Sequence, residues 1–482
     1  MSKVSKVRQQ NSVALPSRFA RALETLQAHA AESAAGPHEA IAIAYSGGLD
    51  SSALLHLAHG YAQSGALKLY AFHIHHGLSP RADAWLLHCE RTCEDLGIRF
   101  EARRVTLEKK DQTGTEEAGR KSRYLALGGL CRAHGVRLLL TAHHQDDQAE
   151  TVLLQLLRGS GPAGLSGMDA ANAAPDLLGN ADLVMARPLL PVSRAQLAAF
   201  VADSDIAYVD DESNADPRFA RNALRHQVMP ALALAFPGFQ QRFARSAQHA
   251  QSAQRLLIEL AAQDLAACLD GERIDLDRLR QLSADRSYNL LRFWFAKRKL
   301  RMPSTAWLAE MLTQLRDARA DAQLCVTHPD CHVWRHRNRL FLTPRLTALS
   351  GTRDADDDQS APGQAFEWHG EASIAFPAYG GTLHFDAVPD AEQGVGAEWL
   401  RQQALEIDFR KGGERLKLAS NRPTKSLKCH YQAFDVPAWE RGRLPLVHAS
   451  GQLLFAAGIG MDCRHLDSAG AARRRLRWQP EV

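Results

Sequence analysis

The chain has 482 residues, of which 45% are apolar and 23% charged, and its formal net charge is +4. This length is too great for one ordinary hydrophobic core, so we expect two to four domains. No apolar run approaches the roughly 18 residues of a membrane span, and the N-terminus lacks the apolar core of a secretory signal. These features predict a cytoplasmic protein with no membrane partner.

The eight cysteines are scattered along the chain, and no CxxC pair occurs. A disulfide framework, a zinc site and an iron–sulfur cluster are therefore not expected. Cys89 and Cys93 lie four residues apart on a predicted helix, and we interpret them as small buried side chains.

The N-terminal half follows an alternating pattern. Residues 1–36 form an N-terminal extension that matches no pattern we can place. In residues 37–228 helical patterns separate apolar strands at 41–45, 69–74, 99–105 and 136–142. Strands about 30 residues apart with helical crossovers predict an α/β fold with a parallel, doubly wound sheet. Ligands of such sheets bind at the carboxyl ends of the strands.

The first predicted strand is followed by the loop SGGLDSS, which consists of Ser46, Gly47, Gly48, Leu49, Asp50, Ser51 and Ser52. Glycine lets backbone N–H groups approach a ligand, and a helix N-terminus adds unpaired donors and partial positive charge. Two glycines alone would suggest a tight turn capped by Asp50, but the strand–loop–helix context favours an anion site.

The chain contains no GxxxxGK[ST], and no GxGxxG follows the first predicted strand, so a kinase-type or dinucleotide-binding loop is not expected there. The loop suits a different cleavage, in which a nucleophile attacks an α-phosphorus and the loop holds pyrophosphate as the leaving group. Asp50 could help to hold Mg²⁺ there.

A second polar cluster, TAHHQDDQAET at residues 141–151, ends the fourth predicted strand and runs into a helix. His143, Asp147 and Glu150 recur at steps of four and three, so we expect them on one helix face with Asp146 beside them. Carboxylates and a histidine at a strand end suit Mg²⁺–ATP binding and proton transfer. The alternative is a solvated acidic first turn.

The C-terminal half changes character near Met229. We expect a helical central domain at 229–349, an acidic linker at 350–364 and a small α+β C-terminal domain at 365–482. Residues 410–482 carry 14 Lys and Arg against 6 Asp and Glu, a net charge of +8, whereas the other 409 residues carry −4. This asymmetry suggests a polyanionic partner, although a solvated basic face is equally consistent with it.

SGGLDSS resembles the PP-loop of N-type ATP pyrophosphatases, which adenylate their substrates. HHQDDQAETVLLQLLRGSG is similar in particular to tRNA(Ile)-lysidine synthetases, and the resemblance covers about residues 37–465. Gly119 stands where that family has alanine. Further matching motifs are HIHHGL (73–78), EEAGRKSRY (116–124), GLSGM (164–168), RPLLPVSR (187–194), DDESNADPRFARNALRH (210–226) and the stretch from RKGGERLK to VPAWERGRLPLV (410–447).

The resemblance implies a two-step reaction that uses ATP and Mg²⁺. The C2 oxygen of the wobble cytidine, in an isoleucine tRNA with a CAU anticodon, attacks the α-phosphorus of ATP and releases pyrophosphate. The ε-amine of free L-lysine then displaces AMP and gives lysidine, so that the tRNA reads AUA.

The resemblance also implies roles for individual residues. The predicted catalytic residues are Asp50, Arg120, Arg123, His143, Asp147 and Glu150. The two arginines would stabilise the pentavalent phosphorus, and the last three residues would bind and deprotonate lysine. The predicted Mg²⁺ ligands are Asp50, Asp146 and Asp147. The C-terminal domain is expected to bind tRNA, and the residues predicted to contact it are Arg221, Asn222, Arg225, Lys425, Lys428 and Arg441.

Other interpretations stay open. A tRNA thiolase of the same superfamily is disfavoured because CxxC is absent, and a catalytically silent RNA-binding protein is disfavoured because the loop is intact. An amidotransferase-linked synthetase has less support, since no glutaminase-like cysteine stands at the N-terminus. Trp439 is expected either to stack on RNA or to anchor the small domain.

Overall fold

The computed structural model describes residues 14–28, 39–65, 67–77, 79–105, 115–210, 220–317, 324–345, 363–389, 392–467 and 472–481. The chain forms two compact units, residues 1–257 and 258–482. The predicted acidic linker lies outside the described residues as far as Pro362. No helix in the described ranges is long and apolar enough to cross a membrane.

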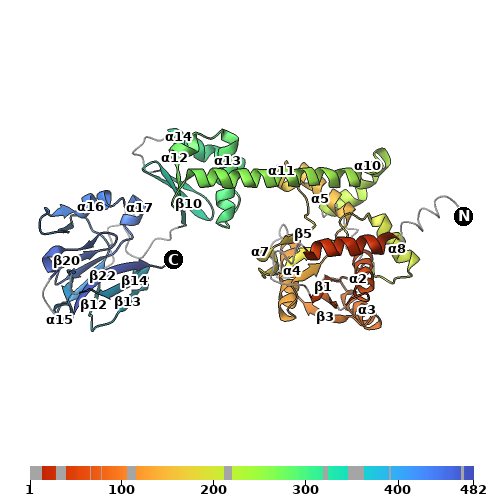
Figure 1. The fold of residues 1–482 in the computed structure, drawn as a ribbon, viewed down its shortest axis with the longest axis horizontal. Helices are drawn as coiled ribbons and strands as arrows, with labels where there is room; N and C mark the ends of the chain where they lie inside the picture. Colours follow the sequence, from red (N-terminus) through yellow and green to blue (C-terminus); the bar gives the residue numbers. More distant parts are fainter. Residues whose placement is uncertain are drawn as a thin grey trace. The chain divides into compact units, whose positions relative to one another are not determined.

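The first unit contains a six-stranded sheet with the order β3-β2-β1-β4-β6-β5. Strands β1, β3 and β5 of this sheet are labelled in Figure 1. Neighbouring strands pair in parallel, except that β5 and β6 are antiparallel. The predicted doubly wound sheet is therefore confirmed, and its order reverses between β1 and β4, where such sheets bind ligands. The strands are β1 Ala40–Ala44, β2 Lys68–His75, β3 Arg99–Arg104, β4 Leu138–Leu140, β5 Ala171–Ala173 and β6 Val184–Ala186.

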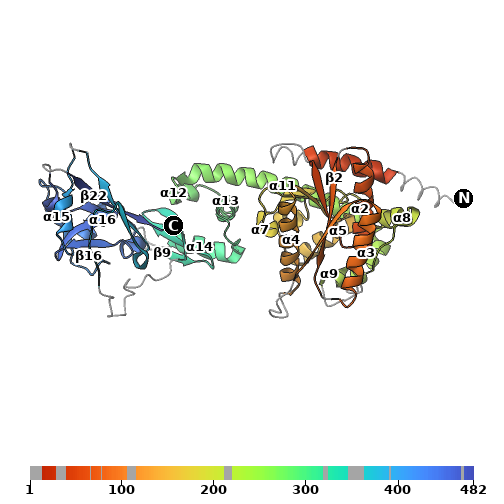
Figure 2. The ribbon, with the colours of Figure 1, turned by 90° about the horizontal axis from the view of Figure 1, so that it is seen from below.

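Helices cover both faces of this sheet, because successive residues of a strand point to opposite sides. Ile41 and Ile43 of β1 pack in the cluster that contains buried residues of α2 (Leu49–Ala62), α3 (Ala82–Asp95) and α8 (Arg194–Asp203). Ala42, between them, packs in the cluster of α4 (Thr115–Ala133) and α7 (Pro175–Leu178). Figure 2 shows these two helical layers on either side of the sheet.

Part of the predicted N-terminal extension belongs to the core. Residues 14–28 form a helix, in which Leu15, Phe19 and Leu23 are at most 1% exposed and pack in the same cluster as α2. Burial of each such side chain contributes roughly 1.5–3 kcal/mol to folding. The helix therefore stabilises the first unit.

Several helices after β4 position polar side chains near the carboxyl ends of the strands. Helix α5 (Gln145–Leu157) begins only after His144, and α6 (Pro162–Leu165) follows it. Later, α9 (Ala220–Ala223) passes into a π-helix, η2 (Leu224–Val228), before α10 (Met229–Ala235). π-Helical turns are rare and occur frequently at functional sites.

Helix α11 (Phe239–Cys268) runs from the first unit into the second. The predicted helical central domain contains helices and also a five-stranded antiparallel sheet, of order β7-β8-β11-β10-β9, that the sequence analysis did not predict. Its elements are β7 Leu269–Asp270, β8 Arg273–Asp275, α12 Leu276–Arg280, α13 Ala284–Lys297, α14 Thr305–Asp317, β9 Leu324–Thr327, β10 Cys331–His336 and β11 Arg339–Pro344.

The C-terminal part has two antiparallel sheets around one core, which confirms the predicted α+β class. The first sheet contains β12 Gln364–Phe366, β16 Leu405–Asp408, β19 Leu446–Ala449, β20 Gln452–Ala456 and β21 Gly460–Met461. The second contains β13 Ser373–Phe376, β14 Gly381–Ala387, β22 Arg473–Pro480 and β15 Val395–Gly396. The remaining elements are α15 Ala397–Arg401, a ribbon of β17 Arg415–Leu416 and β18 Lys425–Ser426, α16 Leu427–Ala433 and α17 Ala438–Arg441.

Candidate active site

The phosphate loop leaves the carboxyl end of β1, and its two glycines differ. Gly47 has φ +83, and a Cβ there would lie 2.8 Å from the Cys89 Sγ and 3.1 Å from a Val209 methyl carbon, so only glycine fits. Gly48 has an ordinary φ of −75, and a Cβ there would meet nothing closer than 3.6 Å. The fold itself therefore requires glycine at position 47, whereas position 48 is open to an approaching ligand.

The serines stiffen the loop. The Ser51 hydroxyl donates to the Gly48 carbonyl oxygen at 3.0 Å, and the Ser52 hydroxyl donates to the Gly47 carbonyl oxygen at 3.3 Å. Both serines are buried, and Ser51 also lies 3.0 Å from the Ser46 hydroxyl. In the structure these hydroxyls hold the loop backbone in place, and their predicted contact with ATP stays a prediction.

Asp50 lies in the first turn of α2, which begins at Leu49 with Gly48 as its N-cap. The simpler interpretation of Asp50 as the N-cap is therefore wrong. Its side chain is 31% exposed, and its Oδ1 is buried with no hydrogen-bond partner among the described residues. The nearest cation to Oδ1 is the Arg194 Nε, at 3.9 Å. A buried carboxylate oxygen without a donor is suited to a hard cation.

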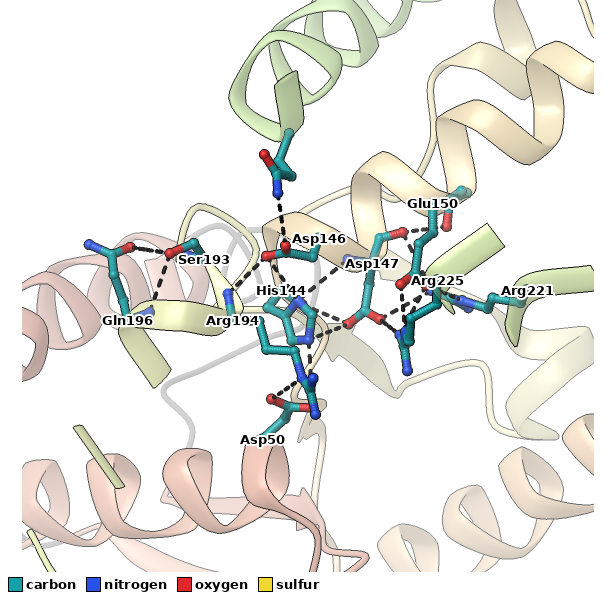
Figure 3. Close-up of polar contacts among 12 residues, drawn as sticks. Asp50, His144, Asp146, Asp147, Glu150, Ser193, Arg194, Gln196, Arg221 and Arg225 are labelled. Carbon is teal, nitrogen blue, oxygen red and sulfur yellow. Dashed lines mark hydrogen bonds and ion pairs between the residues drawn. The ribbon is translucent and has the colours of Figure 1, made fainter. Parts of the chain in front are cut away.

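The segment between β4 and α5 lies beside this loop, because β4 pairs with β1. His144 is the N-cap of α5, and its Nδ1 accepts from the Asp147 N–H at 3.4 Å. Its Nε2 lies 3.6 Å from the Asp50 Oδ2 and 3.4 Å from the Asp147 Oδ2 (Figure 3). Burial lowers the pKa of His144, but Asp50, Asp147 and Asp146 outweigh this and raise it. His144 therefore joins the phosphate loop to α5.

His143 precedes the helix, so the expectation that it shares a helix face with Asp147 and Glu150 is wrong. Its Nδ1 lies 2.9 Å from the Thr141 hydroxyl. Burial lowers the pKa of His143, which keeps the ring neutral near pH 7. It remains a candidate for accepting a proton.

Asp147 and Glu150 form an ion-pair quartet with Arg221 and Arg225. Glu150, whose side chain is 2% exposed, accepts from the Arg221 Nε at 2.8 Å and from the Arg225 Nε at 2.6 Å. The Asp147 Oδ1 accepts from Arg225 at 2.9 Å and from Arg221 at 3.3 Å. These contacts turn both arginines inward, and their predicted tRNA contact stays a prediction, as does that of Asn222. The π-helix η2 places Arg225 in this quartet.

Asp146 is held by its neighbours: the Arg194 N–H donates to it at 2.8 Å and the Gln240 amide donates at 3.3 Å. The described residues contain no group of three His, Cys, Asp or Glu side chains placed around one metal position. The three predicted Mg²⁺ ligands therefore do not form a complete protein cage. Mg²⁺ commonly takes only one or two carboxylates and completes its shell with phosphate and water, and Asp50 fits that pattern.

The two predicted arginines of α4 differ in their contacts. The Arg123 Nε donates to the His76 Nε2 at 3.0 Å, which ties α4 to the carboxyl end of β2. Burial and the Arg123 charge lower the pKa of His76 to about 4, so the ring is a neutral acceptor. Arg120 lies over the Tyr124 ring, 5.8 Å from its centroid. Both guanidinium groups are exposed and available to an anion.

The predicted C-terminal tRNA residues do not share one environment. Lys425 and Lys428 are exposed. The Arg441 Nε donates to the Val436 carbonyl oxygen at 2.9 Å. Trp439 stacks on Trp334 of β10 with centroids 4.6 Å apart, which supports the interpretation that it anchors the small domain.

Three family models match the chain. They are a PP-loop domain at residues 16–232, a TilS substrate binding domain at 274–341 and a TilS substrate C-terminal domain at 405–478. The tRNA(Ile)-lysidine synthase of Burkholderia pseudomallei is 43% identical over 464 residues, which cover 92% of this chain and 94% of that protein. This chain belongs to the tRNA(Ile)-lysidine synthase family.

Other members of the family align over similar lengths. The tRNA(Ile)-lysidine synthase of Ralstonia nicotianae is 40% identical over 88% of this chain and 89% of its own length. That of Serratia proteamaculans is 37% identical over 92% of this chain and 96% of its own length. The family resemblance inferred from the motifs is therefore confirmed.

The sequence analysis assigned no role to two polar residues of the site in this chain. His144 was quoted within HHQDD but given no role, because histidine is not a favoured N-cap. Arg194 ends the quoted motif RPLLPVSR and reaches Asp50 and Asp146 only through the tertiary fold. Cys89 and Cys93 are confirmed as buried, and burial raises the pKa of each thiol to about 12, which makes them unreactive.

Proposed function

We propose that this protein modifies the wobble cytidine of an isoleucine tRNA with a CAU anticodon, consuming ATP and free L-lysine and producing lysidine, AMP and pyrophosphate. The observation that carries the proposal is the convergence of Asp50, His144 and the Asp147–Glu150 quartet at the carboxyl ends of β1 and β4. The identities of the substrates are inferred from membership of the family. A location in the cytoplasm, where tRNA and ATP are found, follows from this activity.

In the first step the C2 oxygen of the cytidine attacks the α-phosphorus of ATP, and pyrophosphate leaves. The loop at Gly47 and Gly48 and the N-terminus of α2 would hold the pyrophosphate. Arg120 and Arg123 would neutralise charge on the pentavalent phosphorus, and His76 would orient Arg123. The cytidine reaches the pocket by flipping out of an already single-stranded loop, which costs little.

Mg²⁺ would be held by Asp50, with Asp146 and Asp147 within reach of the same His144. When bound, the metal would neutralise phosphate charge during adenylation. The unpaired Oδ1 of Asp50 supports this assignment.

In the second step the ε-amine of lysine attacks C2 and AMP leaves. We propose that Asp147 and Glu150 bind lysine and that His143 is a proton acceptor. Both carboxylates are paired with Arg221 and Arg225, so lysine must enter a quartet of two anions and two cations. Free lysine carries charges of both signs, so it can exchange partners with this quartet without leaving a charge buried and unpaired.

Pyrophosphate release tests the proposal. The reaction mixture would contain ATP, lysine and either the isoleucine or the methionine tRNA with a CAU anticodon. We expect release only with the isoleucine tRNA, and Asp50→Asn should abolish it while tRNA binding persists. Normal turnover of Asp50→Asn would show that the Asp50 carboxylate is not needed for adenylation.

A further inference from the structure

Arg187 opens the motif RPLLPVSR and directly follows β6, and the proposed mechanism gives it no role. Its N–H donates to the Ala170 carbonyl oxygen at 2.8 Å, which continues the pairing of β5 with β6. The carbonyl oxygen of the preceding residue, Ala186, accepts from the Thr141 N–H at 2.9 Å, and the Thr141 hydroxyl lies 2.9 Å from the His143 Nδ1. Arg187 therefore lies at the carboxyl edge of the sheet, one strand away from the proposed proton acceptor.

The Arg187 guanidinium is a buried cation that forms no ion pair within the part of the chain that the structure describes. The residue is only 6% exposed. Burial lowers the pKa of Arg187, and the Asp169 carboxylate opposes this only from beyond ion-pair distance. By contrast, Arg221 and Arg225 each contact the Glu150 carboxylate. Burying an ionised group is costly unless it is paired, so this position is suited to an anionic ligand.

One side of this guanidinium is fixed, and the other has no oxygen acceptor among the described residues. The Arg187 Nη1 donates to the Asp169 carbonyl oxygen at 2.7 Å and to the Asn172 Oδ1 at 2.8 Å. The Nη2 contacts the Met185 sulfur, a weak acceptor, at 3.8 Å, and the Nε is buried with no hydrogen-bond partner in the described ranges. Nε and Nη2 together form a fork that matches the two oxygens of a carboxylate. Because Nη1 fixes the plane of the group, this fork is preorganised.

We propose that Arg187 determines substrate specificity by binding the α-carboxylate of free L-lysine through its Nε and Nη2. This inference rests on the proposed function, which takes lysine as a substrate. After burial, the charges of Asp147 and Arg187 act most strongly on the pKa of His143, so Arg187 lies within electrostatic reach of the proposed lysine site. In the sheet β4 separates β6 from β1, and the loop proposed to hold phosphate follows β1. A carboxylate at Arg187 is therefore favoured over a phosphate.

L-Lysinamide, which keeps both amino groups of lysine but lacks the carboxylate, tests the proposal in the full chain. The measurement is the Kd of labelled L-lysine by equilibrium dialysis without tRNA, with displacement by unlabelled lysine or lysinamide. The wild type should bind lysine about 10–100-fold more tightly than lysinamide, as expected for a charged hydrogen-bonded pair. Arg187→Met should weaken lysine binding until this ratio is within about twofold of unity. Arg187→Lys should keep an intermediate ratio, and Arg91→Met, at an exposed position on α3, should keep the wild-type ratio.

The Kd for ATP of the same proteins separates a carboxylate site from a phosphate site. Weaker ATP binding by Arg187→Met with an unchanged lysine-to-lysinamide ratio would overturn the proposal, as would a wild type that binds the two compounds equally or binds neither. If the melting curve shows that Arg187→Met is unfolded, the ratios of the wild type and of Arg187→Lys decide. Because no tRNA is used, selectivity that depends on Arg187 in a chain that makes no lysidine would support the carboxylate site and refute only the proposed function. Lysidine formation by a chain without this selectivity would refute the carboxylate site alone.

Discussion

Gly47 and Gly48 occupy neighbouring positions in the phosphate loop and are needed for different reasons. Gly47→Ala would place a Cβ at a φ of +83 and 2.8 Å from the Cys89 Sγ, so we expect a loss of about 2 kcal/mol of folding free energy. Gly48→Ala should fold normally but lose ATP binding, because its Cβ would enter the space in which we propose that the phosphates bind. Denaturant unfolding and an ATP-binding titration of both variants check this. Equal stability of the two variants would contradict the assignment.

His76 predicts a pH dependence of stability. Its pKa of about 4 in the folded protein lies below the ordinary value of 6.5. As the pH falls through this window, the unfolded chain takes up a proton before the folded one, so folding stability falls. His76→Gln keeps an acceptor for Arg123 but cannot titrate, and its stability should fall less between pH 7 and about pH 4.5. If folding stability fell equally with pH in the wild type and in His76→Gln, His76 would have an ordinary pKa in the folded protein.

At the scale of elements, the quartet of Asp147, Glu150, Arg221 and Arg225 fastens α5 to the segment α9–η2. Glu150→Gln leaves Asp147 as the one carboxylate of the quartet for two guanidinium groups, and we expect a loss of about 3 kcal/mol of folding free energy. We also expect the KM for lysine to rise at least about tenfold, with a much smaller change in the KM for ATP. Glu90→Gln, at an exposed position on α3, is the control. An unchanged lysine KM in Glu150→Gln would make the quartet purely structural.

The elements of the first unit could be predicted because their signals are local. Apolar runs such as 41–45 and 69–74 mark buried parallel strands, and SGGLDSS marks the turn after the first of them. The five-stranded central sheet could not be predicted, because its strands have two to six residues and follow long helices rich in alanine and leucine. The contact between His144 and Asp50 depends on the pairing of β1 with β4, which no local pattern encodes.

At the scale of the whole molecule, the nucleotide site and the predicted tRNA-binding domain at the C-terminus belong to different compact units. A chain that ends at residue 349 keeps every residue of the phosphate loop, of α5 and of the quartet. It should therefore bind ATP with near-normal affinity, but its KM for tRNA should be much higher than that of the full chain. Isothermal titration with ATP and steady-state kinetics with tRNA check both parts. An unchanged KM for tRNA would show that the first unit and central domain hold the tRNA alone.

The most direct test of the account follows labelled lysine into the nucleic acid. The purified protein is incubated with ATP, labelled L-lysine and isoleucine tRNA with a CAU anticodon, and the tRNA is digested to nucleosides for mass spectrometry. The account predicts that the label appears in one modified cytidine at the wobble position, that one AMP forms per lysine incorporated, and that methionine tRNA stays unmodified. Incorporation of sulfur from a sulfur donor in place of lysine, or tRNA binding without any modified nucleoside, would contradict it.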